Sequence, residues 1–95
     1  MTEARRSARV IVTGIVQGVG YRAWAADTAR RHGLSGWVRN RRDGSVEAVF
    51  SGLVEAVDAM VADCDAGPPS AEVIAIETSD WNEPLAEGFH ILPTA

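Results

Sequence analysis

One short segment of the chain combines glycines and an arginine in a way that suits the binding of an anion. Gly14-Ile-Val-Gln17-Gly18-Val-Gly20-Tyr-Arg22 holds three glycines within seven positions and runs into a predicted helix. Glycine backbones reach conformations closed to other residues, so main-chain N–H groups can converge on one point. The helix dipole favours negative charge there, and an arginine in the first helical turn adds two parallel N–H donors. The segment therefore predicts a site for phosphate or a carboxylate.

Two nucleotide-binding motifs share this glycine pattern and must be set aside. The Walker A motif needs a lysine, and this chain contains none. Gly18-Val-Gly20-Tyr-Arg-Ala23 does fit the Gly-x-Gly-x-x-Ala form of the dinucleotide fingerprint. That fingerprint belongs to a parallel βαβ unit with a ribose-binding acid after the next strand, whereas here a predicted hairpin follows the helix. The context argues against a dinucleotide ligand.

A second segment, residues 36–47, completes the pattern, and with it the chain resembles the acylphosphatase family. The stretch Gly14-x-Val16-Gln17-Gly18-Val19-x-x-Arg22 is similar to the family's phosphate-binding loop. The other signature of the family is matched by Gly36-Trp37-Val38-Arg39-Asn40-x-x-Asp43-Gly44-x-Val46-Glu47. The close match spans residues 14–47, about a third of the chain, and the two signatures occur in the family's order.

The resemblance implies an enzyme that hydrolyses the carboxyl–phosphate bond of acyl phosphates to a carboxylate and inorganic phosphate. It implies that Arg22 holds the phosphoryl group, that Asn40 orients the attacking water, and that neither metal nor organic cofactor is needed. Backbone amides would complete the phosphate site, namely those of Gln17, Gly18, Val19, Gly20 and Tyr21. Arg41 departs from the pattern, because some members carry a hydroxyl residue there. No hydroxyl contact to Asn40 is expected from that position.

Elementary chemistry agrees with so small a set of groups. Phosphoryl transfer passes through a loose transition state, so positioning and electrostatic stabilisation supply most of the catalysis. A carboxylate leaves without a general acid because the pKa of its conjugate acid is about 4. The side-chain amide of Asn40 can hold and aim water but cannot act as a base at neutral pH. A phosphate oxygen of the substrate is the expected acceptor of the proton.

The elements that must position these residues follow from periodicity and turn signals. Strands are predicted over 8–16, 34–41, 46–50, 71–78 and 89–92, with helices over 21–32 and 53–66. The order β-α-β-β-α-β with a small final strand is typical of the α+β ferredoxin-like (split βαβ) fold. We therefore expect an antiparallel sheet of four to five strands with both helices on one face. Right-handed crossovers place the first and third strands in the centre.

Length and composition bound the remaining properties. The 95 residues allow one domain, 1–95, with its core over about 8–92. No secretory signal and no membrane-length apolar run is found, so we expect a cytoplasmic protein without membrane contact. We also expect a monomer, although no residue pattern reports the oligomeric state. Cys64 is alone, which excludes a disulfide framework and a cysteine-based metal cluster. We expect it to pack on the apolar side of the second helix, as we expect Trp24, Trp37 and Trp81 to pack in the fold.

Charge is distributed unevenly along the chain. Residues 1–43 hold all nine arginines against three acids, whereas residues 44–95 hold ten acids and no base. A positive local field could steer a small anion, while the acidic remainder would repel nucleic acid. An equally good interpretation is that the charges mix on the folded surface. Likewise, Arg39, Arg41 and Arg42 either recruit substrate or protect a hairpin edge.

Three alternatives to the enzyme stay open at the level of sequence. The first is a non-catalytic phosphate- or carboxylate-binding regulatory module of the same fold. The second is the acylphosphatase-like domain of hydrogenase-maturation carbamoyltransferases, which this chain would present without zinc-finger cysteines or a transferase domain. The third is an RNA-binding module, which would need exposed aromatic residues on the central strands. The residues there do not supply them: Arg9, Ile11, Thr13, Glu47 and Val49. Nor does the sequence select among acyl phosphates: the glycolytic acyl phosphate, acetyl phosphate and carbamoyl phosphate all fit.

Overall fold

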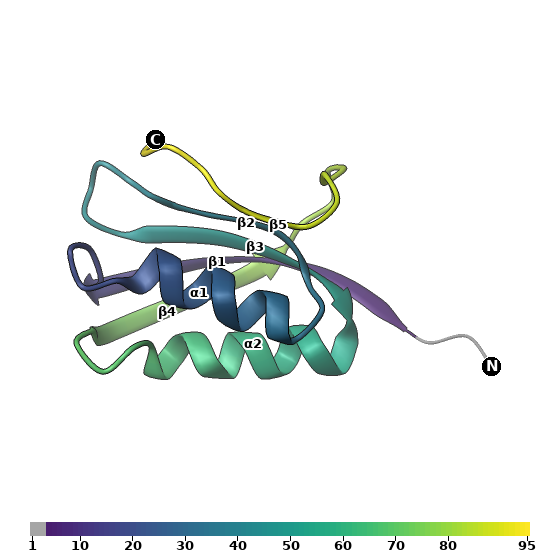
Figure 1. Ribbon diagram of the computed structural model, residues 1–95, viewed down its shortest axis with the longest axis horizontal. Coiled ribbons are helices and arrows are strands. Elements are labelled where there is room, and N and C mark those ends of the chain that lie inside the picture. Colours follow the sequence, from purple (N-terminus) through teal and green to yellow (C-terminus); the bar gives the residue numbers. More distant parts are fainter. Residues whose placement is uncertain (1–3) are drawn as a thin grey trace.

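Two helices lie on one face of a five-stranded sheet in the computed structural model, which describes residues 4–95 (Figure 1). Residues 1–3, which the predicted domain includes, lie outside the described residues. The elements in chain order are β1 (Arg5–Ile15), α1 (Tyr21–Arg31), β2 (Ser35–Asn40), β3 (Val46–Leu53), α2 (Val54–Ala66), β4 (Glu72–Asp80) and β5 (Phe89–Ile91). The predicted α+β ferredoxin-like fold is confirmed, and the predicted element ends lie within about three residues of the observed ones.

The strand order is β4-β1-β3-β2-β5, which places β1 and β3 in the centre as predicted. Neighbours among the first four strands pair antiparallel, but β5 pairs parallel to β2, from Gly36 opposite Phe89 to Val38 opposite Ile91. The expectation of a wholly antiparallel sheet is therefore wrong at its last strand. The chain leaves β4 at the end of the sheet where β2 begins, so β5 must run in the direction of β2.

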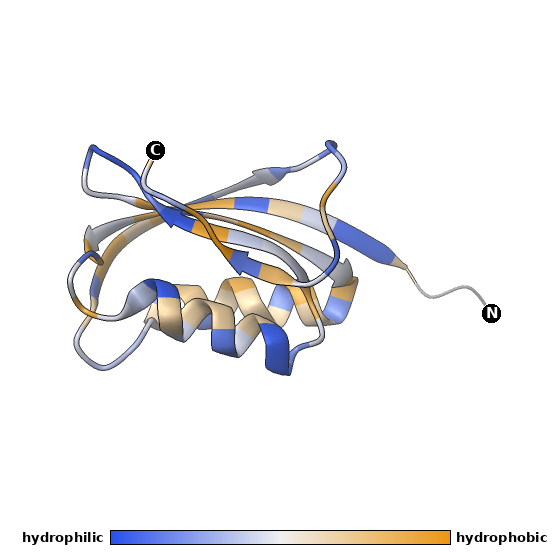
Figure 2. Cartoon of the chain, turned by 45° about the horizontal axis from the view of Figure 1, so that its top comes forward, coloured by the Kyte–Doolittle hydropathy of each residue, from blue (hydrophilic) through white to orange (hydrophobic). Residues whose placement is uncertain are grey.

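The main core lies between the sheet and the helices. Buried apolar side chains of the central strands pack against those of α1 and α2. Figure 2 shows hydrophobic stretches in both the strands and the helices. Phe50 is fully buried there and stacks on Phe89 with ring centroids 5.5 Å apart. Cys64 is buried on α2 as expected, and burial raises the pKa of its thiol to about 12. Within residues 4–95, no helix is long and apolar enough to cross a membrane.

The helix-free face of the sheet is also partly closed. Val49 is fully buried on this face although no helix covers it. Trp37 on β2 meets Trp81 edge to face at 5.8 Å, and the guanidinium of Arg39 lies 4.6 Å from the Trp37 ring centroid. These side chains form a second, thinner apolar layer, which agrees with the packing role predicted for both tryptophans.

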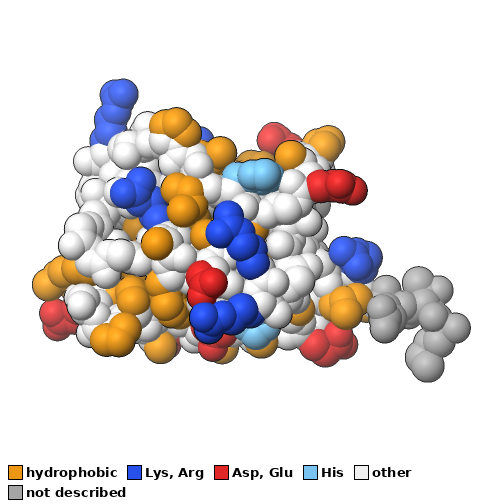
Figure 3. Space-filling model, in the orientation of Figure 1, with side chains coloured by type: hydrophobic (Ala, Val, Ile, Leu, Met, Phe, Trp, Pro, Cys, Tyr) orange, Lys and Arg blue, Asp and Glu red, His pale blue; other side chains and the backbone are white. Residues whose placement is uncertain are grey.

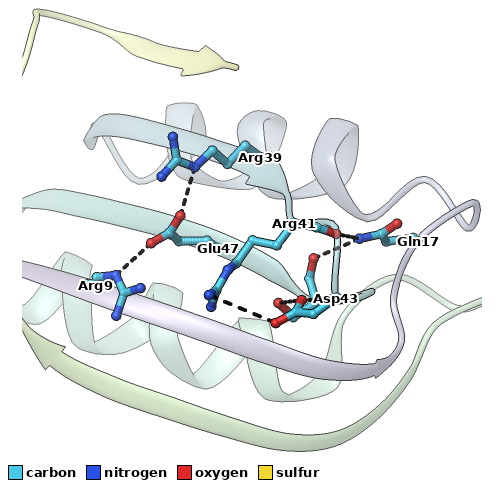
Figure 4. A network of polar contacts seen from close by, with 7 residues as sticks. Arg9, Gln17, Arg39, Arg41, Asp43 and Glu47 are labelled. Atoms are coloured by element: carbon cyan, nitrogen blue, oxygen red, sulfur yellow. Dashed lines mark hydrogen bonds and ion pairs between the residues drawn. The ribbon is translucent and has the colours of Figure 1, made fainter. Parts of the chain in front are cut away.

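A buried carboxylate joins the three inner strands on that face. Glu47 of β3 is 5% exposed and accepts hydrogen bonds from Nε of Arg9 on β1 at 2.7 Å and from Nε of Arg39 on β2 at 2.8 Å (Figure 4). Burial by itself raises the pKa of Glu47, but the two arginines outweigh it and hold the pKa below its usual value. Two arginines from the basic part of the chain are thus paired with an acid from the other part.

Candidate active site

The loop between β1 and α1 presents unpaired main-chain donors to one side of the molecule. Gly18 and Gly20 adopt the left-handed φ values of 73° and 80° that favour glycine. Gly20 caps α1 without any side-chain hydrogen bond, and the first helical bond is donated by the Trp24 N–H to the Gly20 carbonyl at 3.1 Å. The N–H groups of Tyr21, Arg22 and Ala23 precede that bond and find no carbonyl of the helix. Unpaired amides and left-handed glycines thus meet at this junction, and their use in binding an anion stays a prediction.

A pocket of about 260 Å³ opens beside this loop. Arg22 and Asn40 come from different elements and line it together. Its full lining is Val16, Gly18, Gly20, Tyr21, Arg22, Ala23, Asn40 and Ile91. The structure thus brings together five of the seven residues predicted for the site. Gln17 and Val19 do not line the pocket, and Val19 packs partly buried against the main core.

Gln17 instead uses its side chain to fix the loop. Its Nε2 donates to the carbonyl oxygens of Arg41 at 2.7 Å and Ser45 at 2.9 Å, in the turn between β2 and β3 (Figure 4). The same turn is closed by the Arg41 N–H donating to Ser45 O at 2.9 Å and by the carboxylate of Asp43, which accepts from the Ser45 N–H at 2.9 Å. Sequence analysis assigned Gln17 through its backbone amide alone and missed this contact, for which its position in the motif gives no signal.

Asn40 ends β2 and offers an unused acceptor. Its main-chain carbonyl accepts from the Ala95 N–H at 3.0 Å. Its side-chain Oδ1 is buried and has no hydrogen-bond partner within residues 4–95. An unpaired buried acceptor costs roughly 1–3 kcal/mol. Asn40 lines the pocket, but Oδ1 itself is closed to a water-sized molecule in this arrangement, so a donor from a guest reaches it only when the side chain turns.

Arg22 supplies the positive charge of the pocket. It lies half-buried in the first turn of α1 and, among the described residues, takes part in no ion pair and no side-chain hydrogen bond. Arg9 and Arg39, by contrast, are both held by Glu47 on the helix-free face of the sheet. The guanidinium of Arg22 is therefore available to an anion, whereas that of Arg39 is already held by a carboxylate.

Tyr21 fixes the start of α1 to α2. Its hydroxyl donates to the carbonyl of Cys64, near the end of α2, at 2.6 Å, and both residues are buried. Burial is the main reason why the pKa of Tyr21 lies well above its usual value, so the hydroxyl keeps its proton and remains a donor. The helix end that bears the free amides is thereby joined to the second helix.

Other titratable groups stand apart from the pocket. His32 lies 3.0 Å from a carboxylate oxygen of Asp63, and His90 lies 2.7 Å from the carbonyl of Glu87, so neither faces the site. Within residues 4–95, no three His, Cys, Asp or Glu side chains form a group that could hold a metal ion. The chemistry available to the pocket is that of backbone amides, one guanidinium and one side-chain amide.

Comparison with known proteins points to one family. A family model described as acylphosphatase matches residues 8–91. The acylphosphatase of Bradyrhizobium diazoefficiens is 50% identical over 97 aligned residues, covering 96% of this chain and 98% of that protein. Among solved structures, an acylphosphatase from Coxiella burnetii gives a TM-score of 0.88 at 28% identity and covers 93% of both chains. An acylphosphatase from Bacillus subtilis gives 0.84 at 34% identity, covering 94% of this chain and 99% of that one.

Proposed function

The chain belongs to the acylphosphatase family, and from this premise we propose how it works on its small-molecule substrate. Arg22 and the amides of the 16–20 loop and first helical turn hold the phosphoryl group, while Asn40 aims a water at phosphorus. One observation carries the proposal: the free guanidinium of Arg22 and the residue with the unpaired Oδ1, Asn40, line the same pocket. The products are a carboxylate and inorganic phosphate.

Binding of the phosphoryl group rests on charge and on donor geometry. A doubly or singly ionised phosphate meets the N–H groups at the start of α1, the positive end of the helix dipole and the fork of Arg22. The charge of the transition state lies on the same equatorial oxygens, so these donors also stabilise the reaction. Among residues 4–95, no other charged side chain lines the pocket.

The attacking water is held by Asn40. Once the Asn40 side chain turns toward the pocket, its Oδ1 accepts one O–H of the water, which leaves a lone pair of the water oxygen directed at phosphorus. As the new P–O bond forms, the bond from phosphorus to the acyl oxygen breaks and its electron pair departs with the carboxylate. The water loses its proton to a phosphoryl oxygen of the substrate, because the lining contains no carboxylate or imidazole to take it.

We further propose that the enzyme works as a cytoplasmic monomer, without metal or organic cofactor and without nucleic-acid or membrane partners. The reaction as written balances without an added group, and the carboxylate leaves without a general acid. The interpretation of the glycine segment as the phosphate loop belongs to the same proposal. So does the assignment of Gln17 and Val19 to that loop through their backbone amides.

The test measures phosphate release from benzoyl phosphate in the presence of a chelator. We expect Arg22→Ala to lose roughly 10³-fold in kcat/KM, because both binding and charge stabilisation depend on the guanidinium. We expect Asn40→Ala to lose roughly 10²-fold in kcat with a small change in KM. Arg31→Ala and Asn82→Ala are matched controls, since both side chains are exposed and outside the pocket.

Two outcomes would change the assignment. Near-wild-type turnover by Asn40→Ala would remove the water-aiming role. Wild-type protein that binds inorganic phosphate through Arg22 but releases none from benzoyl phosphate would be a phosphate-binding module instead of an enzyme. Loss of metal-free turnover in both site variants, with both controls active, is the result we expect.

A further inference from the structure

The phosphoryl group and the attacking water fill only part of the pocket. One water takes up about 30 Å³ in the liquid, so the pocket volume of about 260 Å³ exceeds what one water and a phosphoryl group fill. The remaining space is available to the acyl group. Three lining residues have no role in binding the phosphoryl group or the water, and they form the walls of this space. They are the buried Val16 and the exposed Ala23 and Ile91.

Ile91 is the large apolar side chain among these. It lies on β5, where it is paired in parallel with Val38 of β2, and Val38 precedes Asn40 by two positions. The next residue of the chain, Leu92, donates its N–H to Val38 O at 2.9 Å. The Ile91 side chain remains 46% exposed while it lines the pocket. Two other large apolar residues are exposed, Ile15 and Ile74, and neither lines the pocket. Ile91 therefore has unburied apolar surface where a substrate can cover it.

We propose that Ile91, together with Ala23, contacts the acyl group and makes the enzyme selective for acyl phosphates with an apolar carbon skeleton. This inference rests on the proposed function, because it assigns the phosphoryl end to Arg22. Covering the exposed part of Ile91 with an apolar group is favourable. A second anionic group on the acyl end finds no cation in the lining, since Arg22 is already engaged by the phosphoryl group.

The first test compares a large and a small apolar acyl group. For Ile91→Ala we expect kcat/KM to fall roughly tenfold with benzoyl phosphate and to change by less than about twofold with acetyl phosphate, which is too short to cover the side chain. Inhibition by inorganic phosphate should be unchanged. Ile15→Ala is the matched control, an exposed isoleucine outside the pocket. Equal losses on both substrates, or no loss on either, would overturn the contact.

The second test isolates charge at constant length. Butyryl phosphate and succinyl phosphate have acyl chains of the same length, but succinyl phosphate carries a second carboxylate. We expect wild-type kcat/KM to be at least roughly tenfold higher for butyryl phosphate, and Ile91→Arg to narrow that ratio by supplying a cation. Equal rates for the two substrates in the wild-type enzyme would overturn the selectivity.

Binding of non-hydrolysable phosphonates separates this inference from the proposed function. Calorimetry with benzoylphosphonate and acetylphosphonate reports the acyl contact without turnover. If the wild-type protein releases no phosphate but Ile91→Ala weakens benzoylphosphonate alone, the catalytic proposal fails and the contact stands. If turnover is normal and the variant binds both phosphonates as the wild type does, the contact fails and the catalytic proposal stands.

Discussion

At the scale of single residues, the pocket depends on two amide side chains, one with an unpaired acceptor and one with a donor that makes two hydrogen bonds. Oδ1 of Asn40 is buried and unpaired within the described chain, so it keeps an acceptor for a guest. Nε2 of Gln17 is saturated by two carbonyls of the turn that follows Asn40. In our proposal, the side-chain amide of Asn40 therefore binds the attacking water. The side-chain amide of Gln17 sets the distance between the 16–20 loop and Asn40.

Gln17→Leu should separate these two roles. We expect kcat to fall roughly tenfold, because the turn that carries Asn40 is no longer held against the loop, with a smaller change in KM. Stability should fall by about 1–2 kcal/mol, since both carbonyls keep main-chain donors from Gly44 and Arg41. Steady-state kinetics and urea unfolding measure the two effects.

Thr13→Val is the control for Gln17→Leu. The Thr13 hydroxyl also donates to a main-chain carbonyl, that of Ala75, at 3.2 Å, but it lies outside the pocket. The control should leave kcat unchanged. A Gln17→Leu variant with lower stability and unaltered kcat would show that the contact supports the fold without positioning Asn40.

At the scale of elements, the start of α1 is joined to the end of α2 by the bond from the Tyr21 hydroxyl to Cys64 O. Tyr21→Phe removes this bond and leaves the buried Cys64 carbonyl without the hydroxyl donor. We therefore expect the free energy of unfolding to fall by about 1–2 kcal/mol. Because the same helix end carries the phosphate-binding amides, KM should rise by more than kcat falls. Urea unfolding and benzoyl phosphate kinetics test both expectations.

Thr28→Val provides the comparison for Tyr21→Phe. The Thr28 hydroxyl donates to the Trp24 carbonyl at 2.8 Å within α1 and joins no second element. We expect this variant to leave KM unchanged. If Tyr21→Phe and Thr28→Val raise KM equally, the bond between the helices has no part in holding the phosphate-binding amides at the start of α1.

The elements themselves could largely be predicted, because their signals are local. Alternating valines identify β1, the Asp43-Gly44 turn identifies the β2–β3 hairpin, and the family signatures bring Arg22 and Asn40 into one hypothesis. The parallel pairing of β5 was missed because the direction of a three-residue strand depends on the route of the loop before it. The burial of Glu47 and Val49 on the helix-free face was also unpredictable, since Arg9, Arg39 and Trp81 reach it only in the folded chain.

At the scale of the whole molecule, the opposite charges of the two parts of the chain meet in space. Figure 3 shows basic and acidic side chains together on the helix-bearing face, and on the other face Glu47 lies between Arg9 and Arg39. The interpretation that the charges mix on folding is therefore supported by these pairs. Because Glu47 is almost completely buried, its charge state matters for the stability of the entire sheet.

Acid should therefore weaken the fold through Glu47. Its pKa in the folded protein lies below the usual 4.5, so its stabilising contribution is complete above about pH 4.5 and is lost as the pH falls through the lower folded value. We expect Glu47→Gln to lose about 2–3 kcal/mol at pH 7, since the arginines can still reach water. Its unfolding free energy should then fall less steeply than that of the wild type below pH 4.5.

Urea unfolding between pH 7 and pH 3 measures this difference, with Glu83→Gln, an exposed loop carboxylate, as the control. The Asp43 carboxylate leaves a residual slope in every variant, because its hydrogen bonds from Ser45 also lower its pKa. Parallel pH profiles for the wild type and Glu47→Gln would contradict the assignment.

The free edge of the sheet has a consequence for self-association. The sheet has two edge strands, β5 with three residues and the longer β4, and the outer side of β4 pairs with no other strand of residues 4–95. Exposed Glu72, Glu77 and Asp80 lie along β4, and a bulge opposite Thr13 and Gly14 interrupts its register. Like charges and a broken register disfavour the addition of a strand from a second molecule. We therefore expect the acidic side chains of β4 to oppose edge-to-edge aggregation of concentrated protein.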